Sequence, residues 1–362
     1  MKKIFLPLSL FAVIHTTHAA SAEHCATLSD NAQRLACYDQ LFAPNQIKKA
    51  SKAVLDLDKS YEKSRATGET EIVISESQIT PTSKEDEAFS SLSFLYDLDK
   101  NSSKGILSVR EHEPMYIMPA WYNTSPNYTP HSPSRGTSDN DIQKKQKRVE
   151  TKMQMSFKTK LMEDVFKTRS DLWFGYTQQS NWQMYTLGDK SAPFRNNDYA
   201  PEIFMTQPVK ANLPWGGKLR VLGAGYVHHS NGQSRPLSRS WNRGYVFAGM
   251  EWGNLTVVPR IWTRIDPETG EKDDNPDIMR YMGYGDLKFM YKFNDKHAAA
   301  ATVRFNPKHG YGAIQADYVF PIKGRLKGYV RGFHGYGENL LEYNHKQTGI
   351  GLGVMLQGWD KH

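Results

Sequence analysis

Polar and apolar residues alternate along many segments of the chain from about residue 105 onward. A clear example runs from residue 152 to 161, where polar residues separate Met153, Met155 and Phe157 from one another. The same alternation returns over residues 349–356, with glycines between the apolar positions. A period of two predicts β-strands with one apolar and one polar face, because successive side chains of a strand point to opposite sides.

Twelve such candidate strands follow one another, separated by turn-rich pieces such as residues 273–276. An even number of half-apolar strands is typical of a bacterial outer-membrane barrel, which leaves no free sheet edge. The pattern therefore predicts an all-β protein whose residues 105–360 form a twelve-stranded antiparallel transmembrane β-barrel; a soluble antiparallel sandwich is the alternative. We expect the strands at residues 106–123, 150–163, 170–186, 199–212, 217–229, 238–252, 254–265, 278–293, 297–306, 310–321, 325–336 and 347–358. Tryptophans near the expected strand ends predict interfacial girdles at Trp173, Trp182, Trp252, Trp262 and Trp359.

The N-terminal part of the chain has a different composition. Two lysines, an apolar run over residues 4–14 and small residues up to Ala22 predict a signal peptide at residues 1–22, cleaved after Ala19 or Ala22. Residues 23–43 predict a small helical element in a periplasmic extension. Its Cys25 and Cys37 are expected to form a disulfide, because an exported protein meets an oxidising compartment. Residues 44–104 are polar and predict a linker or poorly ordered segment.

Composition narrows the classes of function. The 362 residues are enough for a closed barrel, and a mean hydropathy of −0.63 is compatible with strands that are only half apolar. After the N-terminal run, no stretch approaches 18 consecutive apolar residues, so no transmembrane helix is expected. The net charge of +8 is spread along the chain without a compact basic motif. We therefore expect no nucleic-acid partner.

The segment from Tyr226 to Arg243 contains the strongest candidate for chemistry. If residues 222–230 form a strand, His228 and Ser230 lie on the same face, where the imidazole takes the hydroxyl proton. A returning strand would bring Asn242 behind the imidazole. These are the parts of a nucleophilic hydrolase: a nucleophile, a base and a group that orients the base. His229 is an alternative base, but the period of two places it opposite Ser230.

This segment resembles the signature of the bacterial outer-membrane phospholipase A family. Further similarity extends over residues 105–358, at Pro193-Phe-Arg195 with residues 199–201, at residues 273–277 with 281–284, and at residues 335–340. The resemblance implies a twelve-stranded barrel with its catalytic residues on the lipid-facing surface near the outer rim. It implies hydrolysis of phospholipid acyl esters, with phospholipase A1, phospholipase A2 and lysophospholipase activity.

The resemblance also implies roles for further residues. The Gly232 amide would bind the oxyanion, and one Ca²⁺ per active site, shared across a homodimer, would be held by the Ser238 side chain and the carbonyls of Gln233 and Ser191, the last from the second subunit. Gln178 would make a polar dimer contact in the membrane; the alternative is that it points into the wet lumen. Arg235 stands where some members have a carboxylate, and an arginine cannot ligate calcium, which puts a second calcium site in doubt.

Two other functions stay open at this point. A passive porin or structural barrel with a vestigial triad would share the strand pattern. Residues 23–104 would alternatively be a periplasmic interaction module anchored by the barrel. Loss of phospholipid hydrolysis on replacing Ser230 or on chelating calcium separates the enzyme from the porin, and truncation of residues 23–104 tests whether catalysis needs them.

Overall fold

The structure is a computed structural model that describes residues 22–41, 54–55, 74–75, 90–99, 105–138, 141–186, 193–265, 267, 270–323 and 326–359. The chain divides into two units, residues 1–86 and 87–362. The expected signal peptide falls almost entirely on residues 1–21, which lie outside the described residues. No helix in the described ranges is long and apolar enough to cross a membrane.

The first unit contains two short helices, α1 (Ala22–Thr27) and α2 (Asn31–Leu41). Asp30 begins α2, because its carboxylate accepts a hydrogen bond from the backbone N–H of Gln33 at 2.8 Å. A disulfide joins Cys25 to Cys37, with Cα atoms 5.5 Å apart. Farther along, β1 (Val54–Leu55) and β2 (Ile74–Ser75) form a short antiparallel pair.

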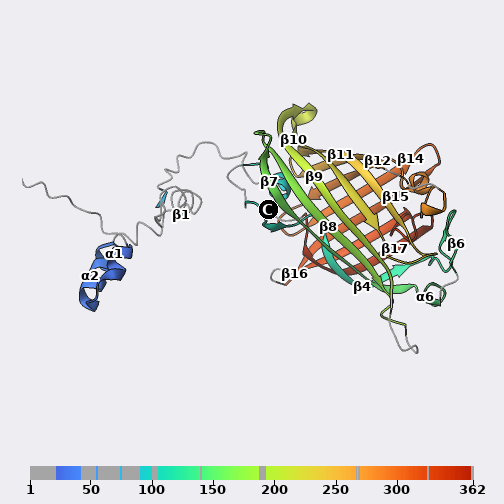
Figure 1. The fold of residues 1–362 in the computed structure, drawn as a ribbon, viewed down its shortest axis with the longest axis horizontal. Coiled ribbons are helices and arrows are strands. Elements are labelled where there is room, and N and C mark those ends of the chain that lie inside the picture. Colours follow the sequence, from blue (N-terminus) through green and yellow to red (C-terminus); the bar gives the residue numbers. More distant parts are fainter. Residues whose placement is uncertain are drawn as a thin grey trace, which may run out of the picture. The chain divides into compact units, whose positions relative to one another are not determined.

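The second unit is a closed antiparallel barrel of twelve strands (Figure 1), which confirms the expected fold class. The ring closes because β7 pairs with both β4 and β8, and β4 pairs with β17. Since every long strand has two neighbours, the barrel has no open edge on which another chain could pair. Its strands are β4 (Met115–Asn123), β7 (Val149–Val165), β8 (Ser170–Trp182), β9 (Phe194–Leu213), β10 (Gly217–Ser230), β11 (Ser240–Trp252), β12 (Leu255–Ile265), β13 (Gly285–Lys292), β14 (Ala298–Asn306), β15 (Tyr311–Lys323), β16 (Leu326–Tyr336) and β17 (Lys346–Gln357).

Short elements connect or accompany these strands. The strand β3 (Val109–Arg110) pairs with β7, and β5 (His131–Ser132) pairs with β6 (Gly136–Thr137) in a separate hairpin. Helices in the second unit are α5 (Ser91–Tyr96), α6 (Asp141–Lys144) and α7 (Ile278–Met282), with 3-10 turns η2 (Pro214–Gly216) and η3 (Gly270–Lys272).

The barrel is polar inside and apolar outside, which explains the alternating sequence. On β7, Lys152, Lys158 and Lys160 are each 2% exposed or less, whereas Met155 is 46% exposed. Several of the buried charges are paired: Arg195 contacts Glu150 and Glu342 at 3.0 and 2.9 Å, as expected where a charge leaves water. The outward apolar face suits contact with membrane hydrocarbon, whereas a soluble sandwich would have to bury such a face.

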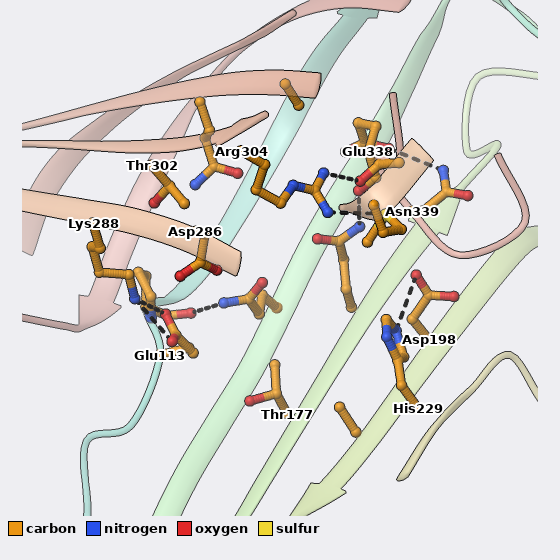
Figure 2. Close-up of a pocket in the computed structure, with 18 of the residues that line it drawn as sticks. Glu113, Thr177, Asp198, His229, Asp286, Lys288, Thr302, Arg304, Glu338 and Asn339 are labelled. Atoms are coloured by element: carbon orange, nitrogen blue, oxygen red, sulfur yellow. Dashed lines mark hydrogen bonds and ion pairs between the residues drawn. The ribbon is translucent and has the colours of Figure 1, made fainter. Parts of the chain in front are cut away.

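A polar cavity of about 270 Å³ lies within the lumen (Figure 2). Glu113, in the segment before β4, accepts hydrogen bonds at its wall from the Lys288 ammonium at 2.9 and 2.7 Å. Burial alone would raise the pKa of the Glu113 carboxyl, but the positive charge of Lys288 is the largest of the influences that lower it to about 2. The carboxylate is therefore ionised throughout the neutral range.

Helix α5 lies inside the barrel, although residues 44–104 were expected to form a linker or poorly ordered segment. Leu92 is completely buried in the luminal core, and its backbone N–H donates to Glu251 at 3.0 Å. The Arg220 guanidinium donates to Ser93 at 2.8 Å, and Asp97 pairs with Arg110 and Lys160. The barrel unit therefore begins at residue 87, and not at the expected residue 105.

Some other expectations are wrong in detail. Residues 278–284 form helix α7 and a turn instead of the start of a strand, and β4 begins at Met115 rather than near residue 106. Trp173 and Trp262 are 0% and 4% exposed and point into the lumen, so they do not belong to an interfacial girdle. The Trp173 indole N–H donates to Thr206 at 2.9 Å and the Trp262 indole N–H to the Gly283 carbonyl at 2.9 Å, partners that a buried indole needs.

Candidate functional site

His228 and Asn242 face each other across two hydrogen-bonded strands. They are directly paired in the register of β10 and β11, and His228 Nδ1 lies 2.7 Å from Asn242 Oδ1. A carbonyl oxygen can only accept, so the bond places the ring proton on Nδ1 and leaves Nε2 as the basic nitrogen. The pairing follows from the hairpin register, which the sequence alone did not specify.

Ser230 shares the outward face of β10 with His228. Along this strand Leu222 and Tyr226 are 44% and 43% exposed, whereas Val221 and Val227 are buried in the lumen. Because side chains alternate along a strand, Ser230, two residues beyond His228, lies on the outward, lipid-facing side.

His229 points the other way, into the lumen. Its Nδ1 accepts a hydrogen bond from the Trp241 indole N–H at 3.3 Å, and its Nε2 lies 3.8 Å from Asp198 (Figure 2). The wall of the barrel therefore separates this imidazole from Ser230. The geometry favours His228 as the partner of the serine.

His228 and Ser230 lie at the barrel rim that carries the long connections. Residues 231–239 join β10 to β11 and residues 266–284 join β12 to β13, whereas turns at the opposite rim, such as residues 166–169 and 253–254, are short. Outer-membrane barrels have long outer loops and short periplasmic turns. The site therefore lies at the outer rim.

The loop after Ser230 is organised by Asn231, which the sequence did not reveal. Its amide donates to the Leu237 carbonyl at 2.8 Å, and its Oδ1 accepts from the backbone N–H of Arg239 at 2.9 Å. The next residue, Gly232, has a φ of +60°, a left-handed conformation that favours glycine. A Cβ at Gly232 would lie 3.0 Å from the ring of Tyr199, which pairs with Ser230 on β9.

Two of the candidate calcium ligands, Gln233 and Ser238, belong to this loop. Gln233 is held by its side chain, which donates to Asn196 Oδ1 at 3.0 Å. The Ser238 hydroxyl donates to Asp274 Oδ2 at 2.6 Å. Hydroxyl, carboxylate and carbonyl oxygens are the ligands that calcium prefers, so the donor chemistry fits the ion. Ser191 lies outside the described residues.

Asp274 was missed as a site residue, because residues 273–277 were read as a turn and as part of the family resemblance, without a role for any side chain. Its Oδ1 accepts hydrogen bonds from Arg135 Nε and Nη2 at 2.8 and 2.5 Å. Its Oδ2 accepts from Ser240 at 3.3 Å in addition to Ser238. The described residues contain no cluster of three or more His, Cys, Asp or Glu side chains that could hold a metal ion.

Gln178 lies on the outer face of β8. Its Oε1 accepts from the Tyr176 hydroxyl at 3.0 Å, and its Nε2 lies 3.4 Å from the Ser180 hydroxyl. The neighbouring Gln179 points inward and donates to the Glu338 carbonyl at 3.2 Å. The alternative orientation of Gln178 into the lumen is therefore not found.

The barrel matches known proteins in both sequence and structure. The model of the family described as phospholipase A1 matches residues 92–356. A protein of Neisseria meningitidis serogroup B is 59% identical over 94% of this chain and 92% of its own length. Phospholipase A1 of Escherichia coli K12 is 39% identical over 57% of this chain and 69% of its own length.

Two solved structures support the same assignment. Outer membrane phospholipase A of Escherichia coli, in a structure described as an active-site asparagine-to-alanine mutant, has a TM-score of 0.64 and 32% identity, covering 71% of this chain and 95% of its own. A Salmonella typhi outer membrane phospholipase, described as a dimer with bound calcium, has a TM-score of 0.64 and 31% identity over 74% of this chain and 98% of its own. The resemblance seen in the sequence is confirmed.

Proposed function

The chain belongs to the outer-membrane phospholipase A1 family of carboxylic ester hydrolases, and we propose that it cleaves phospholipid acyl esters with Ser230, His228 and Asn242 on the lipid-facing surface of its barrel. The observation that carries this assignment is the 2.7 Å contact between His228 Nδ1 and Asn242 Oδ1. His228 lies two residues before Ser230, on the same outward face of β10. A lipid ester in the outer leaflet reaches such a surface without leaving the membrane.

The three side chains divide the chemistry between them. The Ser230 hydroxyl attacks the ester carbonyl, while His228 Nε2 takes its proton and later returns a proton to the leaving alcohol. Asn242 holds Nδ1–H and so keeps Nε2 in the basic tautomer. A neutral amide suits a position beside hydrocarbon, because an unpaired carboxylate there would be costly to desolvate. The active-site asparagine named for the Escherichia coli structure supports this role.

Gly232 is the proposed donor for the oxyanion. Its left-handed backbone lies two residues after Ser230, in a loop held by Asn231, so its amide is fixed before the reaction starts. A preorganised N–H aimed at the developing negative charge stabilises the tetrahedral intermediate.

Calcium is the proposed cofactor, because the Salmonella typhi relative is described with bound calcium and the oxygens at Ser238 suit that ion. The ligands would be the Ser238 hydroxyl, the Gln233 carbonyl and the Ser191 carbonyl of a second copy. One ion per site supplies positive charge beside the oxyanion when bound. Ligation across two copies would make activity depend on dimerisation.

Gln178 is the proposed polar contact between the two barrels. An amide on the lipid face is costly alone and is better satisfied by a partner amide within the membrane. Its bonds to Tyr176 and Ser180 hold it ready at the surface. We extend the proposal to phospholipase A2 and lysophospholipase activity. We also propose a periplasmic location for the part of the N-terminal extension that precedes the barrel unit, residues 23–86.

Replacing the nucleophile tests the assignment. Ser230→Ala should lower fatty-acid release from phospholipid–detergent micelles at least about 10³-fold, since a triad without its nucleophile keeps only residual catalysis. His229→Gln, on the luminal face of the same strand, is the matched control and should keep activity. Addition of a calcium chelator should abolish hydrolysis by the unmodified enzyme. Retained hydrolysis in Ser230→Ala overturns the proposal, and a barrel that never hydrolyses phospholipid returns the porin alternative.

A further inference from the structure

The hairpin β5–β6 at the outer rim donates hydrogen bonds to the segment 272–274. The Ser132 hydroxyl donates to the Asp274 carbonyl at 2.5 Å, and the Ser134 hydroxyl donates to the Asp273 carbonyl. Arg135 Nη2 donates to the Lys272 carbonyl at 3.1 Å. Three successive carbonyl oxygens, of the kind that calcium uses as ligands, therefore already accept hydrogen bonds from the hairpin.

The same hairpin also neutralises the adjacent carboxylate. Arg135 places Nε and Nη2 at 2.8 and 2.5 Å from Asp274 Oδ1, and the two side chains are only 4% and 11% exposed. The other oxygen of Asp274 accepts from Ser238 at 2.6 Å. The guanidinium therefore stands one carboxylate away from the hydroxyl that the proposed function assigns to calcium.

We infer that Arg135 is a built-in cation that takes the place of a metal ion beside Asp274 and thereby prevents a single barrel from binding calcium at Ser238. The inference rests on the proposed function for the position of the calcium site. Two cations cannot neutralise one carboxylate equally well at short range, because their mutual repulsion opposes the second. A protomer then needs the ligand from a second copy before calcium binds, which would link the ion to the dimer.

The oxygens around Asp274 are already contacted by arginine side chains, so a calcium ion would have to compete with these side chains for them. Neighbouring Asp273 is paired with Arg264 at 2.6 Å, and Arg239 Nη1 donates to the Ser238 carbonyl at 2.7 Å. Arginine side chains thus meet the acidic and carbonyl oxygens of this rim from several directions, and Arg135 is the one that contacts the carboxylate bound to Ser238.

Calcium binding to the detergent-solubilised monomer, without substrate, tests the inference. The unmodified monomer should show no calcium-dependent heat in isothermal titration and no calcium-dependent shift in thermal unfolding. Arg135→Gln should gain one site, with affinity at least about tenfold above the unmodified protein, because a repelling charge within a few ångströms of the ion is removed. Arg135→Gln combined with Asp274→Asn should lose the site again.

Matched variants separate charge from damage. Arg135→Lys keeps the positive charge and should stay insensitive to calcium, and so should Arg148→Gln, which removes an exposed arginine from the same rim. Heat-modifiable mobility on a denaturing gel shows whether each barrel is folded, and Arg135→Met, which keeps most of the alkyl stem, replaces Arg135→Gln if the latter is not.

Two results overturn the inference: a folded Arg135 variant that binds no more calcium than the unmodified monomer, or an unmodified monomer that already binds calcium through Ser238. Because no hydrolysis is measured, either outcome is distinct from a failure of the triad, which the Ser230→Ala assay reports.

Discussion

Removal of the Asn242 side chain isolates what the orienting hydrogen bond contributes to catalysis. In Asn242→Ala, His228 Nδ1 loses its partner at 2.7 Å, and the imidazole is free to rotate or to place its proton on Nε2. Ser230 and the loop of Gly232 are unchanged. The variant therefore removes orientation and leaves the nucleophile and the oxyanion donor.

The size of the effect follows from the charge that the ring acquires. In the ground state the bond joins two neutral groups, and such a bond contributes about 1 kcal/mol net. In the transition state the imidazole becomes positively charged, and a hydrogen bond to a charged group is worth about 1.5–3 kcal/mol. The chemical step loses the difference between these two contributions, about 0.5–2 kcal/mol, so kcat should fall roughly 2- to 30-fold, since each 1.4 kcal/mol changes a rate tenfold.

The assay is steady-state release of fatty acid from mixed phospholipid–detergent micelles at saturating calcium, with kcat and KM separated. Asn242→Asp is the informative companion, because the isosteric carboxylate keeps an acceptor for Nδ1–H and should recover part of the lost rate. Ser230→Ala marks the floor. Three results would refute the reasoning: an unchanged kcat in Asn242→Ala, an effect confined to KM, or a rate as low as that of Ser230→Ala.

Three further predictions concern the loop after Ser230, Glu113 in the lumen and Leu92 in helix α5. Gly232→Ala should lower kcat at least about tenfold, since a left-handed non-glycine residue costs ~1–2 kcal/mol and the new Cβ meets the Tyr199 ring at 3.0 Å. The control is Gly253→Ala, which is also left-handed but in open space and should keep kcat. Equal kcat values for the two variants would contradict the role of Gly232. Glu113→Gln should destabilise the barrel by about 1–3 kcal/mol in urea unfolding at pH 7, because Lys288 loses its partner. The folded pKa of about 2 lies below the unfolded value, so this difference should stay constant above about pH 5 and vanish as pH falls toward 2; a pH-independent difference would disprove it. Leu92→Ala should cost about 2–5 kcal/mol in the same unfolding assay, because it empties a fully buried position, and a cost below about 0.5 kcal/mol would show that α5 is not part of the core.

The strand pattern was readable from the sequence wherever one face meets lipid and the other meets the lumen. The apolar and polar positions of β7 and β10 alternate, and this placed His228 and Ser230 on one face and His229 on the other. Strand ends were less certain, because the alternation carries no information on where pairing stops. Helix α7, at residues 278–282, was read as strand since Ile278, Met282 and the residues between them are compatible with either period.

Long-range partners were beyond the sequence. Helix α5 is only six residues long and follows a polar stretch, so nothing local indicated that Leu92 would be buried among luminal side chains. Trp173 and Trp262 are of the residue type found in interfacial girdles. Their side chains nevertheless point into the lumen, where each indole N–H has a hydrogen-bond acceptor.

By itself the sequence determined the barrel class, the face of each catalytic candidate and, through its family resemblance, the chemistry. These properties depend on side-chain alternation and on a contiguous motif, both of which are local. Only the tertiary structure decided that Asn242 meets His228 at 2.7 Å and that Arg135 reaches Asp274 from 139 residues away. Register and loop docking are set by the sum of many distant contacts, and no short stretch of residues contains that sum.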